Sequence, residues 1–576
     1  MTLYNPPLDH MHVVLDPMLD DLAKLPGYQD VDRDLVDQVL EEAGKFASGE
    51  LAPLNAVGDQ QGTHLENGVV RTPDGFKEAY GQFTEAGWHG LPFPEEWGGQ
   101  GLPWTISTAV SEMWHSANTA FSLCPLLTQA GIELLLKFGT DAQKATYLEK
   151  LVSGEWTGTM CLTEPHAGTD VGALKTRAEK DGDHYRIFGT KIFITYGDHD
   201  FTDNVIHMVL ARTPGAPAGT KGISLFIVPK FLVNEDGSPG ARNDLRPVSL
   251  EHKLGIHASP TCVMSFGDNE GAIGYLVGEE QGGMKAMFTM MNNARLAVGL
   301  QGLAIAERAY QAAVDYAKER TQGMRRSNGA TVSAKIIEYP DIKRTLMSMR
   351  CRIEAMRAMI YEGAFALDRA AKLPAGPEQK AAQGRIDLLI PLIKAWCSDH
   401  GFEIASDAVQ VHGGMGFIEE TGIAQHLRDA RIAMIYEGTN GIQALDLVGR
   451  KLPAGNGVHV EALFDGMKGD LDAVDGALKD ALSSALDALR DATDWITDDS
   501  INADDRLAGA TPYLRLFATT LGGFLLARAS TTADAETRAE REASMQFYVQ
   551  HVLPPAVALI PAVKAGVAPD ATANVS

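Results

Sequence analysis

The sequence feature that most constrains the fold is a change of residue pattern in the middle of the chain. From about 156 to 285, short β-branched and aromatic runs alternate with turns, among them HYRIFGTKIFITYG, VIHMVLAR and GISLFIVPKF. Runs of this kind predict the strands of an antiparallel sheet. On both sides of this block, apolar residues recur at the spacing of amphipathic helices. The pattern therefore predicts a mostly α-helical protein with a central β domain.

The length of the chain predicts several domains. A chain of 576 residues is too long for one hydrophobic core. We expect an N-terminal helical domain over 1–155, the β domain over 156–285, a helical bundle over 286–452 and a further helical extension over 453–576. Long amphipathic stretches with short connections predict the bundle. The segment PAGNG at 453–457 predicts a break before the extension.

Charge and cysteine content limit the partners of the chain. With 75 acidic and 50 basic residues, the formal net charge is −25, which repels nucleic-acid phosphates and anionic membranes at long range. The five cysteines are scattered and lack a CxxC pair, so we expect no disulfide framework, no metal site and a reducing, cytoplasmic compartment. The N-terminus lacks signal-peptide character, and no stretch is predicted to be apolar for the length of a membrane span. We therefore expect neither a nucleic-acid nor a membrane partner.

Three distant segments carry a family resemblance. Thr163-Glu164-Pro165 leads to Ala167-Gly168-Thr169-Asp170, then comes Gln410-Val411-His412-Gly413-Gly414, and finally Tyr436-Glu437-Gly438-Thr439. Each segment is weak alone, but in this order they resemble the acyl-CoA dehydrogenases, flavin enzymes that remove two hydrogens from a fatty acyl thioester. The resemblance covers roughly residues 30–452.

The resemblance implies the architecture of the family. It implies an N-terminal helical domain, a middle antiparallel β-barrel-like domain and a C-terminal four-helix bundle, followed here by the extra helical extension of the longer members. His257 stands where arginine is more common. That variant and the long extension are similar to a subgroup that includes 3-methylmercaptopropionyl-CoA dehydrogenase, which makes 3-methylmercaptopropionyl-CoA a candidate substrate. We expect the extension to pack on its own chain or on a partner subunit.

Glu437 is the candidate catalytic base. Removing a poorly acidic α-proton requires a carboxylate in a dry pocket, where desolvation raises its pKa towards neutral pH. The apolar run Ile432–Ile435 before it suits such a pocket. Taken alone, Glu437 also fits a surface carboxylate in a helix–helix turn. Some family members carry the base on an earlier helix, but the corresponding slots here, Asn293 and Ala294, hold no carboxylate.

The resemblance also implies FAD as cofactor and assigns residues to it. The positions are Met160, Leu162 and Thr163 along the isoalloxazine ring, Phe193 and Thr195 on a strand facing it, Arg320 for the pyrophosphate, Gln410, Gly413 and Gly414 for the adenosine half, and Thr439 for a contact with FAD across the dimer. Phe193 stands where tryptophan is usual and keeps the packing face without the indole donor. Each assignment has an alternative without a ligand: a Gly-rich turn after Thr163, a plain core strand at Phe193, and a solvated helix-end arginine at Arg320. On the substrate side the resemblance implies Thr169, Arg295, Tyr436 and Gly438, with Arg295 equally open to a structural role.

The implied reaction is the α,β-dehydrogenation of an acyl-CoA to its trans-2-enoyl-CoA, with electrons passed to an electron-transfer flavoprotein. The implied assembly is a homodimer or a dimer of dimers, with Arg320 and Thr439 reaching FAD held by the neighbouring subunit. Two alternatives stay open. One is an acyl-CoA oxidase, which uses oxygen, and the other is a DNA-associated flavoprotein on the same fold. The latter needs a basic C-terminal patch, whereas the extension carries DGMKGDLDAVDGALKD and DDSINADD.

Overall fold

The chain folds into two compact units. The computed structural model describes residues 4–327, 330–532 and 537–567. Unit 1 comprises Met1–Ser48, Pro103–Ser116 and Arg295–Ser576, and unit 2 comprises Gly49–Leu102 and Ala117–Ala294. Two long helices, α5 (Trp104–Phe138) and α7 (Gly283–Glu319), contribute residues to both units. Because the units interleave along the chain, the domain boundaries expected from the sequence stay a prediction.

Unit 2 is built on an eight-stranded sheet, as the block of β-branched runs predicts. The strand order is β10-β11-β5-β12-β7-β6-β3, and β4 pairs with β5 beside this path. The strands are β3 (Trp156–Cys161), β4 (Arg177–Asp181), β5 (His184–Thr195), β6 (Asn204–Ala211), β7 (Ser224–Pro229), β10 (Leu245–Leu250), β11 (Thr261–Phe266) and β12 (Ala272–Val277). The prediction of an antiparallel sheet needs one correction, because β3 and β6 run parallel. Because β4 and β5 lie between β3 and β6 in the sequence, the two parallel strands are not consecutive in the chain.

The long strand β5 gives the sheet its curl. Its first half pairs with β4 and β12, and its second half pairs with β11. Between these halves the sheet changes partners, and the β5–β11 register shifts by a bulge at Ile192 and Phe193, between the pairs Lys191–Met264 and Ile194–Cys262. Bulges increase local twist and redirect side chains. Apolar side chains from these strands form one buried cluster, including Ile187, Ile194, Val209, Phe226 and Met264.

Helices and two small ribbons complete unit 2. They are α3 (Ala52–Gln61), α4 (Phe76–Glu85), α6 (Asp141–Ser153) and the unit 2 residues of α5 and α7, with the ribbons β1 (His64–Glu66) with β2 (Val69–Arg71) and β8 (Phe231–Val233) with β9 (Pro239–Arg242). Thr140 begins α6 with a capping box, its hydroxyl accepting from the Gln143 N–H at 3.2 Å. This signal is readable in the sequence as Thr-x-x-Gln.

One long apolar helix corrects an expectation from the sequence. Among the described residues, α5 alone is long and apolar enough to cross a membrane, with mean hydropathy 1.4 over its most apolar 18 residues. Of that window, 83% is buried inside the structure. Core helices of globular proteins combine the same length and hydropathy, so these two properties do not distinguish a membrane span from a core helix.

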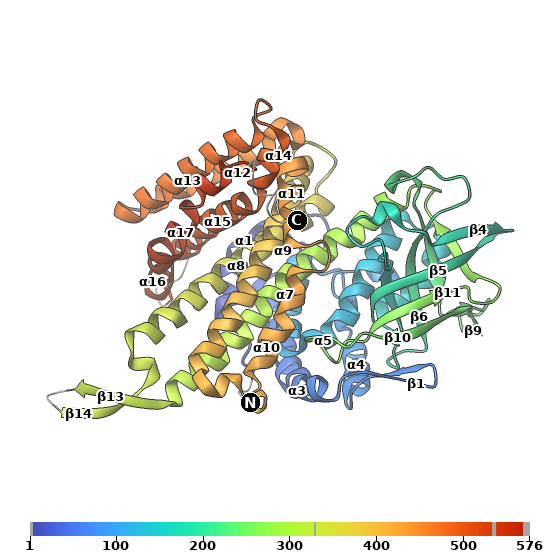
Figure 1. The fold of residues 1–576 in the computed structure, drawn as a ribbon, viewed down its shortest axis with the longest axis horizontal. Coiled ribbons are helices and arrows are strands. Elements are labelled where there is room, and N and C mark those ends of the chain that lie inside the picture. The colour runs from blue at the N-terminus through green and yellow to red at the C-terminus, as the bar shows by residue number, and fades with distance from the viewer. Residues whose placement is uncertain (1–3, 328–329, 533–536, 568–576) are drawn as a thin grey trace. The chain divides into compact units, whose positions relative to one another are not determined.

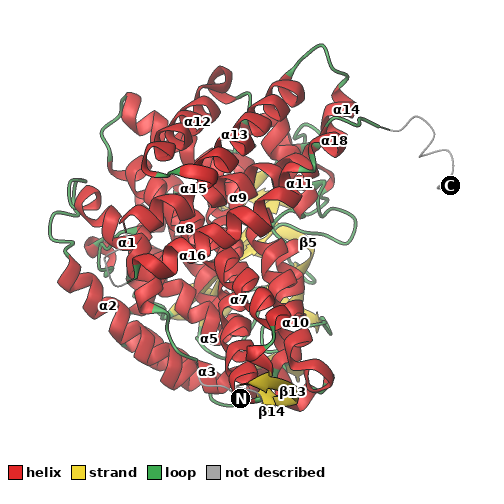
Figure 2. Ribbon diagram, turned by 90° about the vertical axis from the view of Figure 1, so that its left-hand side faces the viewer, coloured by secondary structure: helices red, strands yellow, loops and turns green. Residues whose placement is uncertain are grey.

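The described residues of unit 1 form helices and one ribbon, as the returning helical periodicity predicts (Figure 2). Its helices, besides its parts of α5 and α7, are α1 (Leu8–Leu22), α2 (Arg33–Phe46), α8 (Pro340–Lys372), α9 (Pro377–His412), α10 (Ile423–Ala430), α11 (Asn440–Asp446), α12 (Val458–Asp470), α13 (Gly476–Thr497), α14 (Ala503–Ala508), α15 (Ala510–Thr532), α16 (Arg538–Phe547), α17 (Leu553–Val557) and α18 (Ile560–Val563). The antiparallel neighbours α8 and α9 pack along each other, and α10 packs on α9. Together with α7 they form the predicted bundle.

Glycines let α7 and α9 approach closely. A Cβ on Gly302 of α7 would lie 2.3 Å from the Cys397 carbonyl oxygen of α9, and one on Gly299 would lie 2.4 Å from the Ile393 side chain. The reverse contact is equally tight, since a Cβ on Gly401 of α9 would lie 2.5 Å from the Gly302 carbonyl. Backbone therefore packs directly on backbone at this crossing, and only glycine fits there.

The extension packs on its own chain, which is one of the two arrangements expected from the sequence. Helix α15 contacts α8, α9 and α11, and α16 contacts α8. At the α9–α15 contact the buried Trp396 indole donates to Thr519 Oγ1 at 3.0 Å, and the Tyr548 hydroxyl donates to the Thr519 carbonyl at 2.9 Å. A buried indole needs such a partner.

The segment after Arg320 forms a β-ribbon. Strand β13 (Thr321–Ser327) pairs with β14 (Ala330–Lys335) in antiparallel register, from Thr321–Lys335 to Ser327–Ala330 (Figure 1). The two residues between the strands, 328–329, lie outside the described residues. In sequence they are Asn-Gly, a strong hairpin signal.

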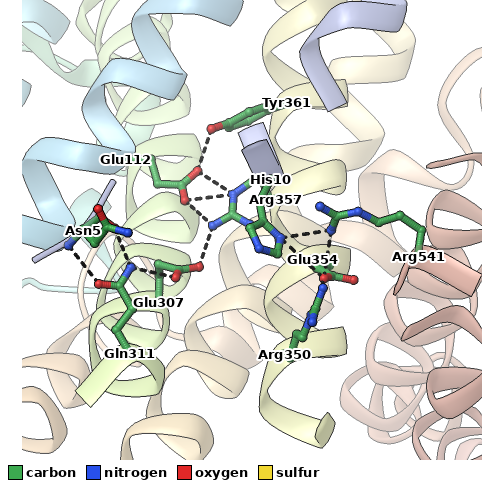
Figure 3. Close-up of polar contacts among 10 residues, drawn as sticks. All are labelled: Asn5, His10, Glu112, Glu307, Gln311, Arg350, Glu354, Arg357, Tyr361 and Arg541. Atoms are coloured by element: carbon green, nitrogen blue, oxygen red, sulfur yellow. Dashed lines mark hydrogen bonds and ion pairs between the residues drawn. The ribbon is translucent and has the colours of Figure 1, made fainter. Parts of the chain in front are cut away.

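A buried ionic cluster joins α5, α7 and α8 within unit 1 (Figure 3). The fully buried Arg357 binds Glu112 through two nitrogens, at 3.0 Å from Nε and 2.6 Å from Nη2, and binds Glu307 at 2.8 Å. The Tyr361 hydroxyl donates to the second Glu112 oxygen at 2.6 Å. Each charge is paired and hydrogen bonded, as burial requires.

A second buried carboxylate, Glu354 on α8, ties the two ends of the chain to the bundle. Glu354 pairs with Arg350 and Arg541 at 2.9 Å and with His10 at 3.6 Å (Figure 3). Burial alone raises the pKa of Glu354, but the His10 hydrogen bond and the two arginines lower it to about 2. His10 belongs to α1 and Arg541 to α16, so Glu354 anchors both the N-terminal helix and the extension.

Candidate active site

The candidate base Glu437 lies in a short turn of unit 1. The 3-10 helix Arg431–Met434 precedes it, and α11 follows, capped by the Thr439 hydroxyl that accepts from the Ile442 N–H at 3.4 Å. Both Glu437 and Gly438 have left-handed φ values, 56° and 86°. Glycine adopts this conformation freely, whereas a glutamate does so only where its surroundings hold it.

Three side chains from three helices hold the carbonyl groups of this turn, and we name Arg295, Lys394 and Gln443 the turn clamp. Arg295 on α7 donates from Nε to the Glu437 carbonyl at 3.2 Å. Gln443 on α11 donates to the Glu437 and Gly438 carbonyls at 3.2 and 3.3 Å. Lys394 on α9 donates from Nζ to the Gly438 carbonyl at 2.7 Å. Each carbonyl thus has two donors, which accounts for the left-handed pair.

The close crossing of α7 and α9 brings the clamp together. Arg295 lies one helical turn before Gly299, and Lys394 directly follows Ile393, which packs against that glycine. The Arg295 guanidinium also pairs with Asp446 on α11, Nη1 to Oδ2 at 3.6 Å. These contacts support the structural role that the sequence left open for Arg295. Its role towards a substrate stays a prediction.

The surroundings of Glu437 shift its acidity. Burial raises the pKa of Glu437 to about 7, although the charges of Arg295 and Lys394 act in the opposite direction. Its side chain nevertheless keeps partial exposure. A carboxylate that titrates near neutral pH and remains accessible fits a general base. Beside it, the Tyr436 hydroxyl donates to Gln301 on α7.

Of the substrate-side residues, Tyr436, Gly438 and Arg295 therefore lie together with Glu437, whereas Thr169 belongs to unit 2. Thr169 is exposed in the loop after β3. The proposed roles of all four towards a substrate stay predictions, because contacts within the chain do not test them.

In unit 2, the residues predicted to face the flavin ring lie on β3, the loop after it and β5. Met160 and Thr163 are half-buried and Leu162 is 9% exposed, while the Thr163 carbonyl accepts from the Ile192 N–H at 2.9 Å. That bond joins the two predicted flavin segments. Thr195, opposite Thr261 on β11, is half-buried.

Phe193 does not behave as a core-strand residue. It is 58% exposed and has a left-handed φ of 59° at the β5 bulge. A large aromatic side chain held outward by a strained backbone presents a face for a planar ligand. This observation disfavours the alternative of a plain core strand.

A buried ion pair fixes Glu164 of the Thr163-Glu164-Pro165 segment within the protein. The fully buried Lys191 donates to Glu164 and to the Leu162 carbonyl, both at 2.9 Å. Glu164 also accepts from Thr176 at 2.6 Å. Burial raises the pKa of Glu164, but Lys191 and these donors lower it below its ordinary value. The sequence reasoning missed this pair, because a lysine on a strand and an acid 27 residues earlier carry no spacing signal.

The residues predicted for the pyrophosphate, for the adenosine half and for the FAD contact across the dimer lie in unit 1 and are exposed. They are Arg320 after α7, Gln410 near the end of α9, Gly413 and Gly414 after it, and Thr439. A Cβ on Gly413 or Gly414 would meet no atom within 4 Å, so the chain itself leaves the space over both open. The Arg320 guanidinium donates from Nη2 to the neighbouring Gln322 side chain at 3.3 Å. These residues are available to an anionic ligand, and the structure shows no contact that joins them into one site.

Sequence reasoning also missed a carboxylate beside the alternative base position. Asn293 donates from Nδ2 to Glu133 on α5 at 2.8 Å, and burial raises the pKa of Glu133 to about 7. Neither Asn293 nor Ala294 is a carboxylate, as the sequence indicates, but Glu133 from α5 is hydrogen bonded to Asn293. Both residues belong to unit 2, and Glu437 belongs to unit 1.

Comparison with known proteins assigns the family. The N-terminal, middle and C-terminal domains of acyl-CoA dehydrogenase match residues 35–155, 159–269 and 281–452, and an acetyl-CoA dehydrogenase C-terminal-like domain matches 463–571. The chain is 46% identical to 3-methylmercaptopropionyl-CoA dehydrogenase of Ruegeria pomeroyi over 522 residues, 89% of this chain and 88% of that protein. The chain belongs to the acyl-CoA dehydrogenase family and is an oxidoreductase of the long form.

Solved structures agree with the fold. An acyl-CoA dehydrogenase complexed with FAD from Bacillus anthracis is 23% identical, with a TM-score of 0.76 over 97% of this chain and 92% of that one. The Caenorhabditis elegans protein ACDH-11, solved in complex with C11-CoA, is 21% identical, with a TM-score of 0.77 over 96% and 93%. At these identities the likeness establishes the fold with its extension.

Proposed function

We propose that this protein is an FAD-dependent acyl-CoA dehydrogenase in which Glu437 removes the α-proton of the acyl thioester. The observation that carries the proposal is the Glu437 turn. Its carboxylate is partly exposed, has a pKa raised to about 7 by burial, and lies on a left-handed backbone held by the turn clamp. A pre-positioned base of matched pKa is what abstraction of a weakly acidic proton requires.

The residues present fit FAD. The outward, strained Phe193 offers an aromatic face, and the other predicted residues, Met160, Leu162, Thr163 and Thr195, lie on β3, the loop after it and β5. The exposed Arg320 suits a pyrophosphate, Gln410, Gly413 and Gly414 suit the adenosine half, and Thr439 suits a contact with FAD across the dimer. FAD, when bound, supplies the hydride-accepting chemistry. The chain's own part is to hold Glu437 in position.

The finer assignments extend the same proposal. The product is the trans-2-enoyl-CoA, and the electrons pass to an electron-transfer flavoprotein. The similarity to the Ruegeria pomeroyi protein favours 3-methylmercaptopropionyl-CoA as a substrate. Five free, buried cysteines suit the cytoplasm. We further propose a homodimer or a dimer of dimers, with acyl-CoA and the electron acceptor as partners and no nucleic acid or membrane.

The test is to purify the protein and mix it with acyl-CoAs of short, branched, long and sulfur-containing chains without oxygen. We expect a yellow protein whose flavin absorbance bleaches with at least one of them. A colourless protein that cannot be reconstituted with FAD contradicts the proposal. Hydrogen peroxide formed in stoichiometric amounts during aerobic turnover would instead support the oxidase alternative.

A DNA-associated flavoprotein is the alternative from another class. The described part of the extension is acidic, with Asp470, Asp491 and Asp499 facing its few basic residues. Binding to a labelled DNA duplex at low salt would separate the two functions, and we expect none.

A further inference from the structure

We propose that Lys394 positions the Glu437 turn for proton abstraction and that its positive charge favours the carboxylate form of Glu437. The inference rests on the proposed function and assigns a positioning residue to it. Lys394 is fully buried in α9. A lysine is rarely buried so completely unless it is paired with an acid. Here its two hydrogen bonds go instead to the Gly438 carbonyl at 2.7 Å and to Asn440 Oδ1 at 2.8 Å.

Asn440 makes this contact rigid. Its amide nitrogen donates to the Ala395 carbonyl at 3.2 Å, to Ser398 Oγ at 3.0 Å and to Asp399 Oδ1 at 2.6 Å. The Asn440 amide is thereby oriented with its oxygen towards Lys394. One turn of α9 thus binds both Gly438, the second residue of the left-handed pair, and Asn440, the first residue of α11. The backbone direction at Glu437 is fixed from both ends.

Lys394 and Glu437 act on each other electrostatically, and Arg295 is the second cation near the turn. The charged groups acting on Glu437 are Arg295 and Lys394, and those acting on Lys394 are Glu437, Asp399 and Arg295. Arg295 is already paired with Asp446, and Asp399 is bound by Asn440 and influenced by Arg515 on α15. Lys394 has no salt bridge of its own among the described contacts, so no carboxylate is hydrogen bonded to its ammonium group.

Burial cost supports a functional reason for this lysine. Burial lowers the pKa of Lys394 to about 7, against the attraction of Glu437. An apolar residue of the same volume would avoid that cost. Removing the ammonium group takes away one of two cations that stabilise the Glu437 carboxylate, so the pKa of Glu437 is expected to rise further.

Lys394→Met tests the proposal, because it keeps the length of the side chain and removes the charge and both hydrogen bonds. We expect single-turnover reduction of bound flavin by acyl-CoA to slow at least tenfold at pH 7. We expect the midpoint of its pH dependence to move up by about 1 pH unit. Hydrogen exchange of the amides of residues 437–440 should accelerate, while FAD content and acyl-CoA affinity stay within twofold.

Two variants complete the experiment. Lys394→Arg keeps a cation and should return the pH midpoint to within about 0.3 units of wild type. Lys380→Met, which removes an exposed lysine from the same helix, should change none of the readouts. If Lys394→Met does not fold, Lys394→Arg carries the test through amide exchange and pH midpoint together.

Wild-type amide exchange and a wild-type pH midpoint in Lys394→Met would overturn the proposal. Failure of the proposed function is distinguishable from this outcome. It would appear as a wild-type protein whose flavin no acyl-CoA reduces, and amide exchange over 437–440 would then decide the positioning role alone.

Discussion

At the scale of single residues, the chemistry of the candidate site is concentrated in the backbone of Glu437 and Gly438. The left-handed conformation is costly at Glu437, and its persistence needs the donors of the turn clamp. The same donors bring positive charge close to a carboxylate whose burial favours the neutral acid. The balance of these opposing effects leaves the pKa of Glu437 near neutral pH.

That balance predicts a pH dependence. Glu437 accepts a proton only as the carboxylate, and its pKa is raised to about 7. The rate of flavin reduction by acyl-CoA should therefore rise with pH through a midpoint near 7 and level off above it. Stopped-flow absorbance from pH 5.5 to 8.5 measures this rate. A rate independent of pH over this range would mean that Glu437 titrates at its ordinary pKa or is not the base.

The sequence indicates which residue types carry chemistry but not how they are held. The segment around Glu437 could be predicted as the base because a motif in the order of a known family identifies it. Lys394 and Gln443 could not be predicted, because they act through backbone carbonyls and have no spacing signal. Phe193 was predicted to pack on the flavin, whereas its bulge and left-handed φ depend on β11, the strand that pairs with it.

At the scale of secondary-structure elements, the α7–α9 crossing places two of the three clamp residues. Gly299 and Gly302 on α7 and Gly401 on α9 allow direct backbone contact. The long helices themselves could be predicted from their periodicity. Their close approach could not, because glycines inside a helix more often signal a weak helix than a contact. The parallel β3–β6 pair and the β13–β14 ribbon were likewise missed, since strand pairing is set by tertiary contacts.

Gly302→Ala is the variant that tests this crossing. The added Cβ would lie 2.3 Å from the Cys397 carbonyl, so α7 and α9 must separate, at a cost of about 1–3 kcal/mol. The expected result is a lower free energy of unfolding and slower flavin reduction, because the clamp opens with the crossing. Denaturant unfolding and single-turnover kinetics measure the two effects.

Gly466→Ala on α12 is the matched control for this variant. A Cβ there meets nothing within 4 Å, so the higher helix propensity of alanine should leave the protein unchanged or slightly more stable. Equal effects of the two variants would show that the crossing tolerates a side chain and that it does not position the site.

At the scale of the whole molecule, both ends of the chain and the extension belong to one helical unit. The buried pairs of Glu354 with His10 and Arg541 tie α1 and α16 to α8, and Trp396 ties α15 to α9. The helical character of the extension could be predicted from its periodicity. Its attachment through single buried charges could not, because ion-pair partners hundreds of residues apart leave no local pattern.

The assembly of the molecule can be tested through Arg320. We proposed that this exposed arginine and Thr439 reach FAD held by a neighbouring subunit. Arg320→Ala should therefore lower the affinity for FAD while the protein remains folded, and the effect should depend on protein concentration. Flavin absorbance and light scattering of the same samples measure both quantities. A monomer with full flavin content would contradict the shared site.

The central claim is that Glu437 is the base, and Glu437→Gln tests it most directly. The change is nearly isosteric and leaves the backbone carbonyl that the clamp holds, so FAD content and acyl-CoA binding should persist. The amide cannot accept the α-proton, and general-base catalysis is typically worth about 10²–10⁴-fold. The measurement is single-turnover reduction of the flavin by a competent acyl-CoA, wild type beside variant. We predict a loss of several orders of magnitude in the variant. Reduction within tenfold of wild type would show that the base lies elsewhere, with Glu133 beside Asn293 the next residue to test.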